Sequence, residues 1–145
     1  MALGQSDTSL VRELAAEFPD ARRARVDDGA DAWLRELIAR VAREVGHPGR
    51  DHSIPLDLRG TVFQWKVWHA LQEIPAGETR SYTALARALG SPRAVRAVAG
   101  ACAANKVAVV VPCHRVIRED GSLGGYRWGL PLKERLLATE RAASA

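Results

Sequence analysis

The junction Gly90-Ser91-Pro92 constrains the fold of this 145-residue chain most strongly, because it separates two short segments that both have helical character. One helix is predicted over 81–89, ending at Gly90. Ser91 is a good N-cap and Pro92 suits the first helical position, so a second helix is predicted from there to about residue 103. Two short helices joined by a tight turn are typical of a DNA-binding helix-turn-helix, and also of an ordinary helical hairpin.

Charge is distributed unevenly along the chain. Residues 1–57 carry 8 basic and 11 acidic side chains, whereas residues 58–145 carry 13 and 6. No Asp or Glu lies between Thr79 and Arg118, although both acids are plentiful elsewhere, which argues against a merely Arg-rich composition. A basic face of this kind indicates a polyanionic partner, usually nucleic acid. The cations of this acid-free stretch are Arg80, Arg87, Arg93, Arg96, Lys106, Arg115 and Arg118.

The second predicted helix carries little side-chain bulk. Apart from Arg93 and Arg96, most of its residues are alanine or glycine. Such a helix can approach a DNA groove closely, and it can equally pack tightly against a neighbouring element, so its composition leaves both interpretations open. Asn105 and Lys106 then end the helix, because Asn tolerates left-handed backbone angles and bonds to nearby backbone.

Cys113 is the candidate nucleophile. It follows the apolar run 107–111 and precedes His114 and Arg115, and a thiol beside a cation is typical of a cysteine with a depressed pKa. The alternative is a buried structural cysteine with a chance histidine neighbour. The only other cysteine is Cys102, and neither residue has the spacing of a zinc site, so no metal is expected.

The first half of the chain contains two amphipathic patterns, which predict helices over 7–17 and 30–45. The polar segment 47–53 is the predicted boundary between two lobes. We therefore expect a helical N-terminal part over 1–53 and a second domain over 54–145, which opens with a short extended segment. The chain shows neither a signal peptide nor a stretch long enough to span a membrane, so we expect a cytoplasmic protein in a reducing compartment.

The remaining elements of the second domain are predicted from turn residues and apolar spacing. A helix is expected over 61–74, a hairpin-type turn over 119–122 and a loop over 124–129. Pro131 opens the last helix, which carries Glu140 near its end and is expected to fray beyond it. The inward-facing residues of that helix are Leu132, Leu136 and Leu137.

Several spaced motifs resemble the methylated-DNA–protein-cysteine methyltransferases, also called O6-alkylguanine-DNA alkyltransferases. The resemblance covers about residues 58–140 and is specific because the motifs agree in order, while a weaker likeness extends to the start of the chain. It implies a mostly α fold with short β elements (α+β) and a winged helix-turn-helix-like C-terminal lobe. The motifs are Arg93 to Val98, Ala103 to Asn105, Pro112 to Val116, Gly125 to Gly129 and Lys133 to Glu140.

The resemblance also implies a chemistry. Cys113 corresponds to the thiol that irreversibly accepts an alkyl group from O6 of guanine, with O4 of thymine as a further candidate, and no cofactor is needed. His114 corresponds to the base that deprotonates the thiol through a water, and Glu140 to the carboxylate that orients the histidine. Tyr82 corresponds to the phenol that hydrogen-bonds the departing guanine. Each molecule would act once.

The implied partner is double-stranded DNA containing O6-alkylguanine, bound by a monomer. Members of this family flip the target nucleotide and present the recognition helix to the minor groove, whereas the helix-turn-helix pattern alone favours the major groove. Arg96 corresponds to the side chain that enters the base stack, and Asn105 to the hinge between the recognition helix and an active-site strand. Further DNA contacts are expected from Thr83, Ser91, Arg93, Ala97, Gly100 and Lys106. The base pocket is expected to involve Val116, Tyr126, Arg127 and Trp128.

Family members usually begin with a small β-sheet, and this sequence is expected to start after that sheet and to keep only the helices that follow. Two rival functions stay open. Alkyltransferase-like proteins share the DNA-binding half and bind lesions without an acceptor cysteine, so Cys113 favours transfer. In a plain helix-turn-helix transcription factor, Cys113 would be incidental.

Overall fold

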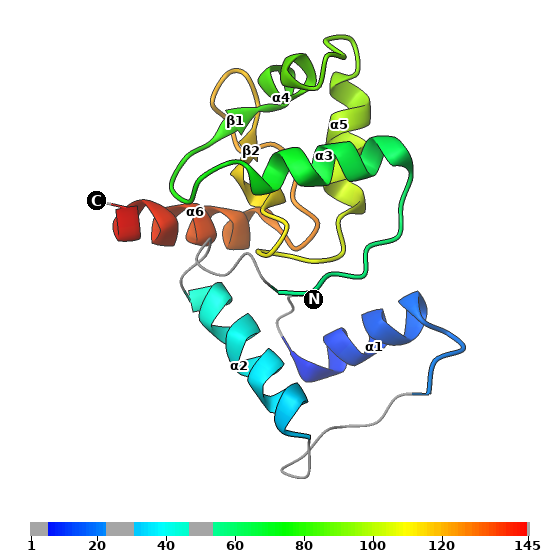
Figure 1. Ribbon diagram of the computed structural model, residues 1–145. Coiled ribbons are helices and arrows are strands. Elements are labelled where there is room, and N and C mark those ends of the chain that lie inside the picture. The colour runs from blue at the N-terminus through cyan, green and yellow to red at the C-terminus, as the bar shows by residue number, and fades with distance from the viewer. Residues whose placement is uncertain (1–5, 23–30, 47–53, 145) are drawn as a thin grey trace.

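The computed structural model describes residues 6–22, 31–46 and 54–144. The predicted lobe boundary at 47–53 lies outside these residues. The described chain is mostly helical and contains one short two-stranded sheet, as the sequence predicts (Figure 1). In chain order the elements are α1 (Asp7–Glu17), α2 (Ala32–Gly46), α3 (Val62–Gln72), β1 (Arg80–Ser81), α4 (Tyr82–Ala88), α5 (Val95–Ala104), a 3-10 turn (Cys113–Arg115), β2 (Val116–Ile117) and α6 (Leu130–Ser144).

Side-chain caps fix the starts of three helices. Ser6 accepts a hydrogen bond from the Ser9 amide at the start of α1. Thr61 forms a capping box with Gln64 at the start of α3, in which each side chain bonds the other residue's backbone amide. Ser81 caps α4 by accepting from the Ala84 amide at 3.0 Å. Such caps satisfy backbone donors that the first helical turn leaves unpaired.

The start predicted for α5 was wrong by one turn. The helix begins at Val95, and no side chain caps it. Ser91 lies four residues before Val95, at the C-terminal end of α4, and its carbonyl accepts from the Ala94 amide at 2.8 Å to close a turn ahead of the helix. Its amide bonds the Ala86 carbonyl at 3.0 Å, while Gly90, at a φ of 67°, bonds the Arg87 carbonyl at 2.9 Å. This pair of bonds is a Schellman motif, which requires the left-handed glycine.

The core lies where α5 packs against both α3 and α4. Val67, Trp68 and Leu71 of α3 are buried against Leu85 of α4 and Val98 of α5. The Trp68 indole also donates to the Ala101 carbonyl at 2.9 Å, so its polar atom is satisfied inside the core. This packing fixes one face of α5 against the body of the molecule.

The sheet joins two segments far apart in the sequence. β1 and β2 pair in parallel, with Arg80 opposite Val116 and Ser81 opposite Ile117. The turn over 119–122 forms, with Gly121 at a φ of 82°, but it does not connect antiparallel strands as a hairpin would. The segment 54–58 is not a strand, and the chain reaches Cys113 through turns instead of the active-site strand that the resemblance implies.

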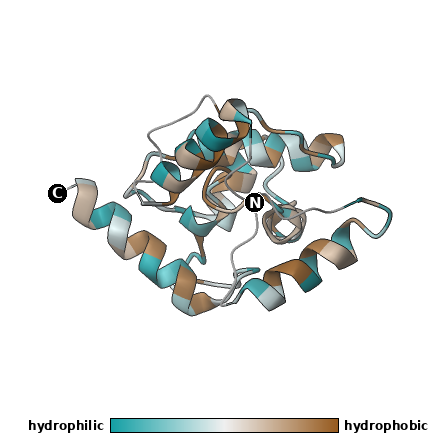
Figure 2. Cartoon of the chain, turned by 90° about the horizontal axis from the view of Figure 1, so that it is seen from below, coloured by the Kyte–Doolittle hydropathy of each residue, from teal (hydrophilic) through white to brown (hydrophobic). Residues whose placement is uncertain are grey.

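The first two helices are amphipathic but contribute little to this core. α1 and α2 lie together below the other helices in Figure 1. No residue of α1 is buried, and Glu44 is the only buried residue of α2. Figure 2 shows hydrophobic and hydrophilic residues alternating along the helices. Large apolar side chains of these two helices that remain exposed are Val11, Leu14, Phe18, Trp33 and Ile38.

The last helix, α6, packs against the 3-10 turn that begins at Cys113. The sequence predicts that this helix frays after Glu140. In the structure it stays helical to Ser144. Leu136 and Leu137 face inward, and Lys133 and Glu140 are buried beside them. None of the described helices is long and apolar enough to cross a membrane.

Candidate active site

Asn105 connects the end of α5 to the candidate nucleophile. It is the C-cap of α5 and is buried. Its Nδ2 donates to Cys113 Sγ at 3.1 Å and to the Val111 carbonyl at 2.8 Å, while its Oδ1 accepts from the Val107 amide at 2.9 Å. Asn105 therefore fixes the position of the thiol relative to α5, and the hinge role that the resemblance implies for it stays a prediction.

Glu140 forms hydrogen bonds with the two buried polar side chains that follow Cys113 in the sequence. Its Oε1 lies 2.7 Å from His114 Nε2, and Arg115 donates to it through Nε and Nη2. Its Oε2 also accepts from the Gly77 amide at 3.1 Å. Burial alone would raise the pKa of Glu140, but the hydrogen bonds from His114 and Arg115 lower it from about 4.5 to about 2. The carboxylate is therefore ionised at neutral pH.

The partner of His114 selects its tautomer. Burial lowers the pKa of His114, so the imidazole is neutral at neutral pH. With Glu140 ionised, Nε2 carries the proton and donates it in the hydrogen bond. Nδ1 is then unprotonated, and it is buried without a hydrogen-bond partner among the described residues. This arrangement leaves His114 with one nitrogen that can accept a proton.

The prediction that a neighbouring cation depresses the pKa of Cys113 was wrong. Burial raises the pKa of the thiol and outweighs the opposing effects of the Asn105 hydrogen bond and the Lys133 charge. Arg115 is adjacent in sequence, but its guanidinium donates to Glu140 and, at 2.6 Å, to the Ile74 carbonyl. Cys113 is consequently a thiol in the DNA-free protein and needs a base before it can attack.

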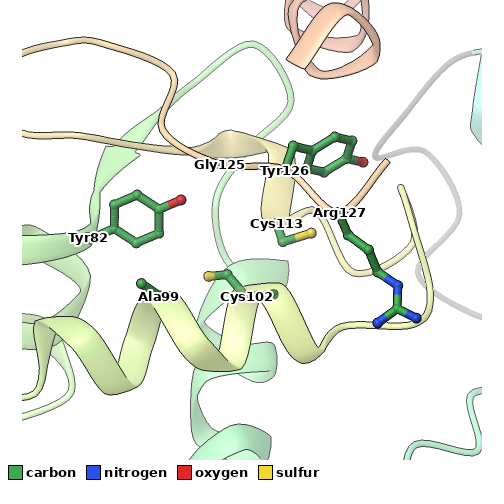
Figure 3. A pocket seen from close by; sticks show the side chains of 8 residues that line it. Tyr82, Ala99, Cys102, Cys113, Gly125, Tyr126 and Arg127 are labelled. Carbon is green, nitrogen blue, oxygen red and sulfur yellow. The ribbon is translucent and has the colours of Figure 1, made fainter. Parts of the chain in front are cut away.

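Cys113 faces a cavity of about 320 Å³ that lies between α5 and the loop before α6 (Figure 3). In Figure 3 the Tyr82 side chain comes from the start of α4 with its hydroxyl directed into this space, and Arg127 lies at the opposite end. Burial raises the pKa of Tyr82 to about 12, so the phenol stays protonated and can donate. The lining residues are Tyr82, Ala99, Cys102, Ala103, Cys113, Gly125, Tyr126 and Arg127.

The other predicted pocket residues lie behind the cavity wall. Val116 is buried in β2, and Trp128 packs edge-on against Tyr126 with ring centroids 5.3 Å apart. The sequence interpretation missed Ala99, Cys102, Ala103 and Gly125. The first three recur at helical spacing on one face of α5, a signal that was present in the sequence. Among the described residues, no group of three or more His, Cys, Asp or Glu side chains is placed to hold a metal ion.

The sequence interpretation also missed Lys133. Its Nζ is buried and donates to the carbonyls of Val116, at 2.6 Å, and Leu123. The carbonyl of Gly125, which lines the cavity, lies 3.4 Å away. Lys133 thus ties the pocket loop to β2, just after Cys113. The sequence did hold a signal for the burial of Lys133, because this residue falls among the inward-facing leucines of α6.

Most of the residues that are predicted to contact DNA are exposed to solvent. Arg93, Arg96, Ala97, Gly100 and Lys106 are at least partly exposed, and all but Arg93 and Lys106 belong to α5. Thr83 and Ser91 are half-buried at the start and just beyond the end of α4. One side of α5 is therefore open, and the other carries the pocket and the core.

Residues 62–142 match the family model described as the DNA-binding domain of 6-O-methylguanine DNA methyltransferase. This match covers more than half of the chain. The chain belongs to the methylated-DNA–protein-cysteine methyltransferase family, as the sequence motifs indicate.

Relatives and solved structures agree with this assignment. The chain is 51% identical over 140 residues to the bifunctional transcriptional activator/DNA repair enzyme Ada of Escherichia coli, covering 95% of this chain and 38% of that protein. It is 49% identical over 128 residues to the inducible methylated-DNA–protein-cysteine methyltransferase of Bacillus subtilis, covering 88% and 69%. The structure of Mycobacterium tuberculosis OGT in complex with DNA aligns with a TM-score of 0.68 at 43% identity, covering 74% and 67%.

Proposed function

We propose that this chain repairs DNA by transferring a methyl or other alkyl group from O6 of guanine to Cys113. The observation that carries this proposal is the thiol at the wall of a cavity, with His114 and Glu140 directly behind it. Family membership supports the same reaction, and the DNA complex of the Mycobacterium tuberculosis relative supports DNA as the partner. The cavity of about 320 Å³ falls within the range of small-ligand pockets, about 300–1,000 Å³.

The protonation states of the site residues suggest the order of steps in the transfer reaction. The flipped base enters the cavity, and Nδ1 of His114 takes the thiol proton through a water. The sulfur then attacks the alkyl carbon, a C–S bond forms, and the C–O6 bond breaks with its electron pair on guanine. Tyr82, which remains protonated, donates a hydrogen bond to the guanine as its ring gains negative charge. Glu140 stabilises the imidazolium that results.

Mass analysis tests this proposal directly. Incubation with a duplex that contains O6-methylguanine should replace one proton of the protein by one methyl group, and peptide mapping should locate that methyl on Cys113. An unmodified duplex of the same sequence is the control. Lesion binding without a mass change would instead support an alkyltransferase-like binding module, and binding governed by sequence alone would support a transcription factor.

We expect His114→Ala to slow methyl transfer by about 10²- to 10⁴-fold, the usual contribution of a positioned base. The thiol is protonated before reaction, so loss of the base affects the chemical step directly. Single-turnover rates at saturating DNA measure this effect, and binding affinity should stay close to that of the natural protein. Thermal unfolding of the variant checks that the buried cluster survives. Weaker binding with an unchanged saturated rate would make His114 a DNA contact and not a base.

A further inference from the structure

One acidic residue of α1 contacts two cations beside the cavity. Glu17, the last residue of α1, lies 3.1 Å from Lys106 Nζ and 3.9 Å from Arg127 Nη2 through its two carboxylate oxygens. Lys106 follows Asn105, the residue that bonds the Cys113 sulfur, and Arg127 lines the cavity itself. Glu17 thus contacts two of the chain segments that border the candidate active site.

These pairs are poorly suited to a structural role. The side chains of Lys106 and Arg127 are 55% and 40% exposed and that of Glu17 is 21% exposed, and ion pairs in which solvent reaches every partner contribute little to stability. No residue of α1 is buried, so α1 is not held to the rest of the molecule by a buried apolar face. The contact is therefore one that salt or a competing anion can break.

The two cations belong to the part of the chain whose charge attracts a polyanion. Residues 58–145 carry 13 basic and 6 acidic side chains, whereas residues 1–57 carry 8 and 11. The acidic end of α1 therefore meets the basic half of the chain beside the cavity. A carboxylate that pairs with a lysine and an arginine uses the same donors that a DNA phosphate would use.

We infer that Glu17 competes with DNA phosphates for Lys106 and Arg127, so that α1 weakens DNA binding until the DNA displaces its acidic end. This inference rests on the proposed function, because it takes DNA as the partner of the same site. DNA that reaches the cavity separates Glu17 from both cations, so each bond that forms between a phosphate and one of these cations is opposed by the loss of an ion pair.

The test compares Glu17→Gln with the natural chain on an unmodified duplex. We expect Glu17→Gln to bind about two- to fivefold more tightly at low salt, the increase expected from freeing exposed ion pairs. The increase should shrink as the salt concentration rises, because salt also screens the ion pairs of Glu17, so the affinities of the two proteins converge at high salt. Glu13→Gln is the matched control, since it removes the same charge one turn earlier and leaves the Glu17 pairs in place.

Two further measurements separate competition from a general charge effect. Lys106→Gln and Arg127→Gln together should remove most of the affinity increase caused by Glu17→Gln, because a double-mutant cycle isolates the coupling. Amide hydrogen exchange in α1 should quicken when the natural chain binds DNA. An equal increase from Glu13→Gln, or no increase from Glu17→Gln in a chain that transfers methyl to Cys113, would overturn this inference alone. A natural chain that binds no DNA would overturn the proposed function with it.

Discussion

Replacing Cys113 by alanine is expected to abolish methyl transfer completely and to leave DNA binding nearly unchanged. The sulfur is the atom that accepts the methyl group in the proposed reaction, and it lies at the cavity wall. Asn105, which donates to this sulfur, keeps its second bond to the Val111 carbonyl in the variant. The backbone around the site should therefore persist, and the loss should appear in the transfer rate alone.

Cys102 supplies the matched control for this prediction. It lines the same cavity, so a methyl group could in principle reach it. Burial and the nearby Cys113 raise the pKa of Cys102 to about 12, which keeps its sulfur protonated, and its sequence neighbours are alanines instead of a histidine. Cys102→Ala should retain full transfer. Methyl found on Cys102 of the Cys113→Ala protein, or undiminished transfer by that protein, would show that the acceptor is misassigned. Peptide mapping after incubation with methylated duplex distinguishes these results.

The sequence predicts the helices and the chemistry-bearing residues because both leave local signals. Apolar spacing and turn residues locate α1 and α3 to within a residue or two. Cys113, His114 and Arg115 stay close together in the structure because they form one 3-10 turn. Glu140 lies 26 residues further on, so its contact with His114 follows from the family resemblance and not from spacing.

Features that depend on tertiary placement were not predictable. Ser91 is suited to cap α5, but it lies in the Schellman motif that closes α4, and a turn separates it from Val95, a placement that its residue type does not reveal. The pKa of Cys113 depends on burial, which a sequence neighbour such as Arg115 does not reveal. The contact of Glu17 with Lys106 joins residues that lie in opposite halves of the chain. Long-range contacts of this kind leave no periodic signal in the chain.

Removing the carboxylate of Glu140 should destabilise the protein more than any other single charge removal considered above. Glu140→Ala leaves the buried guanidinium of Arg115 without its anion, and breaking a buried ion pair in this way typically costs about 3–5 kcal/mol. It also removes the acceptor of the Gly77 amide. Urea unfolding at neutral pH measures the change. Glu134→Gln, which alters an exposed carboxylate on the same helix, should shift the free energy of unfolding by about 0.5 kcal/mol or less.

The pH dependence of unfolding provides the second half of the same prediction. The pKa of Glu140 is about 2 in the folded protein and about 4.5 when unperturbed, so the folded state binds the proton more weakly than the unfolded state. The stabilisation is therefore complete above about pH 4.5 and is lost as the pH falls towards 2. In Glu140→Ala this part of the acid sensitivity should disappear, and the stability curves of the two proteins should approach each other at low pH. A constant offset across that range, or a loss below about 1 kcal/mol at neutral pH, would mean that Arg115 finds other partners and that Glu140 does not hold the cluster together.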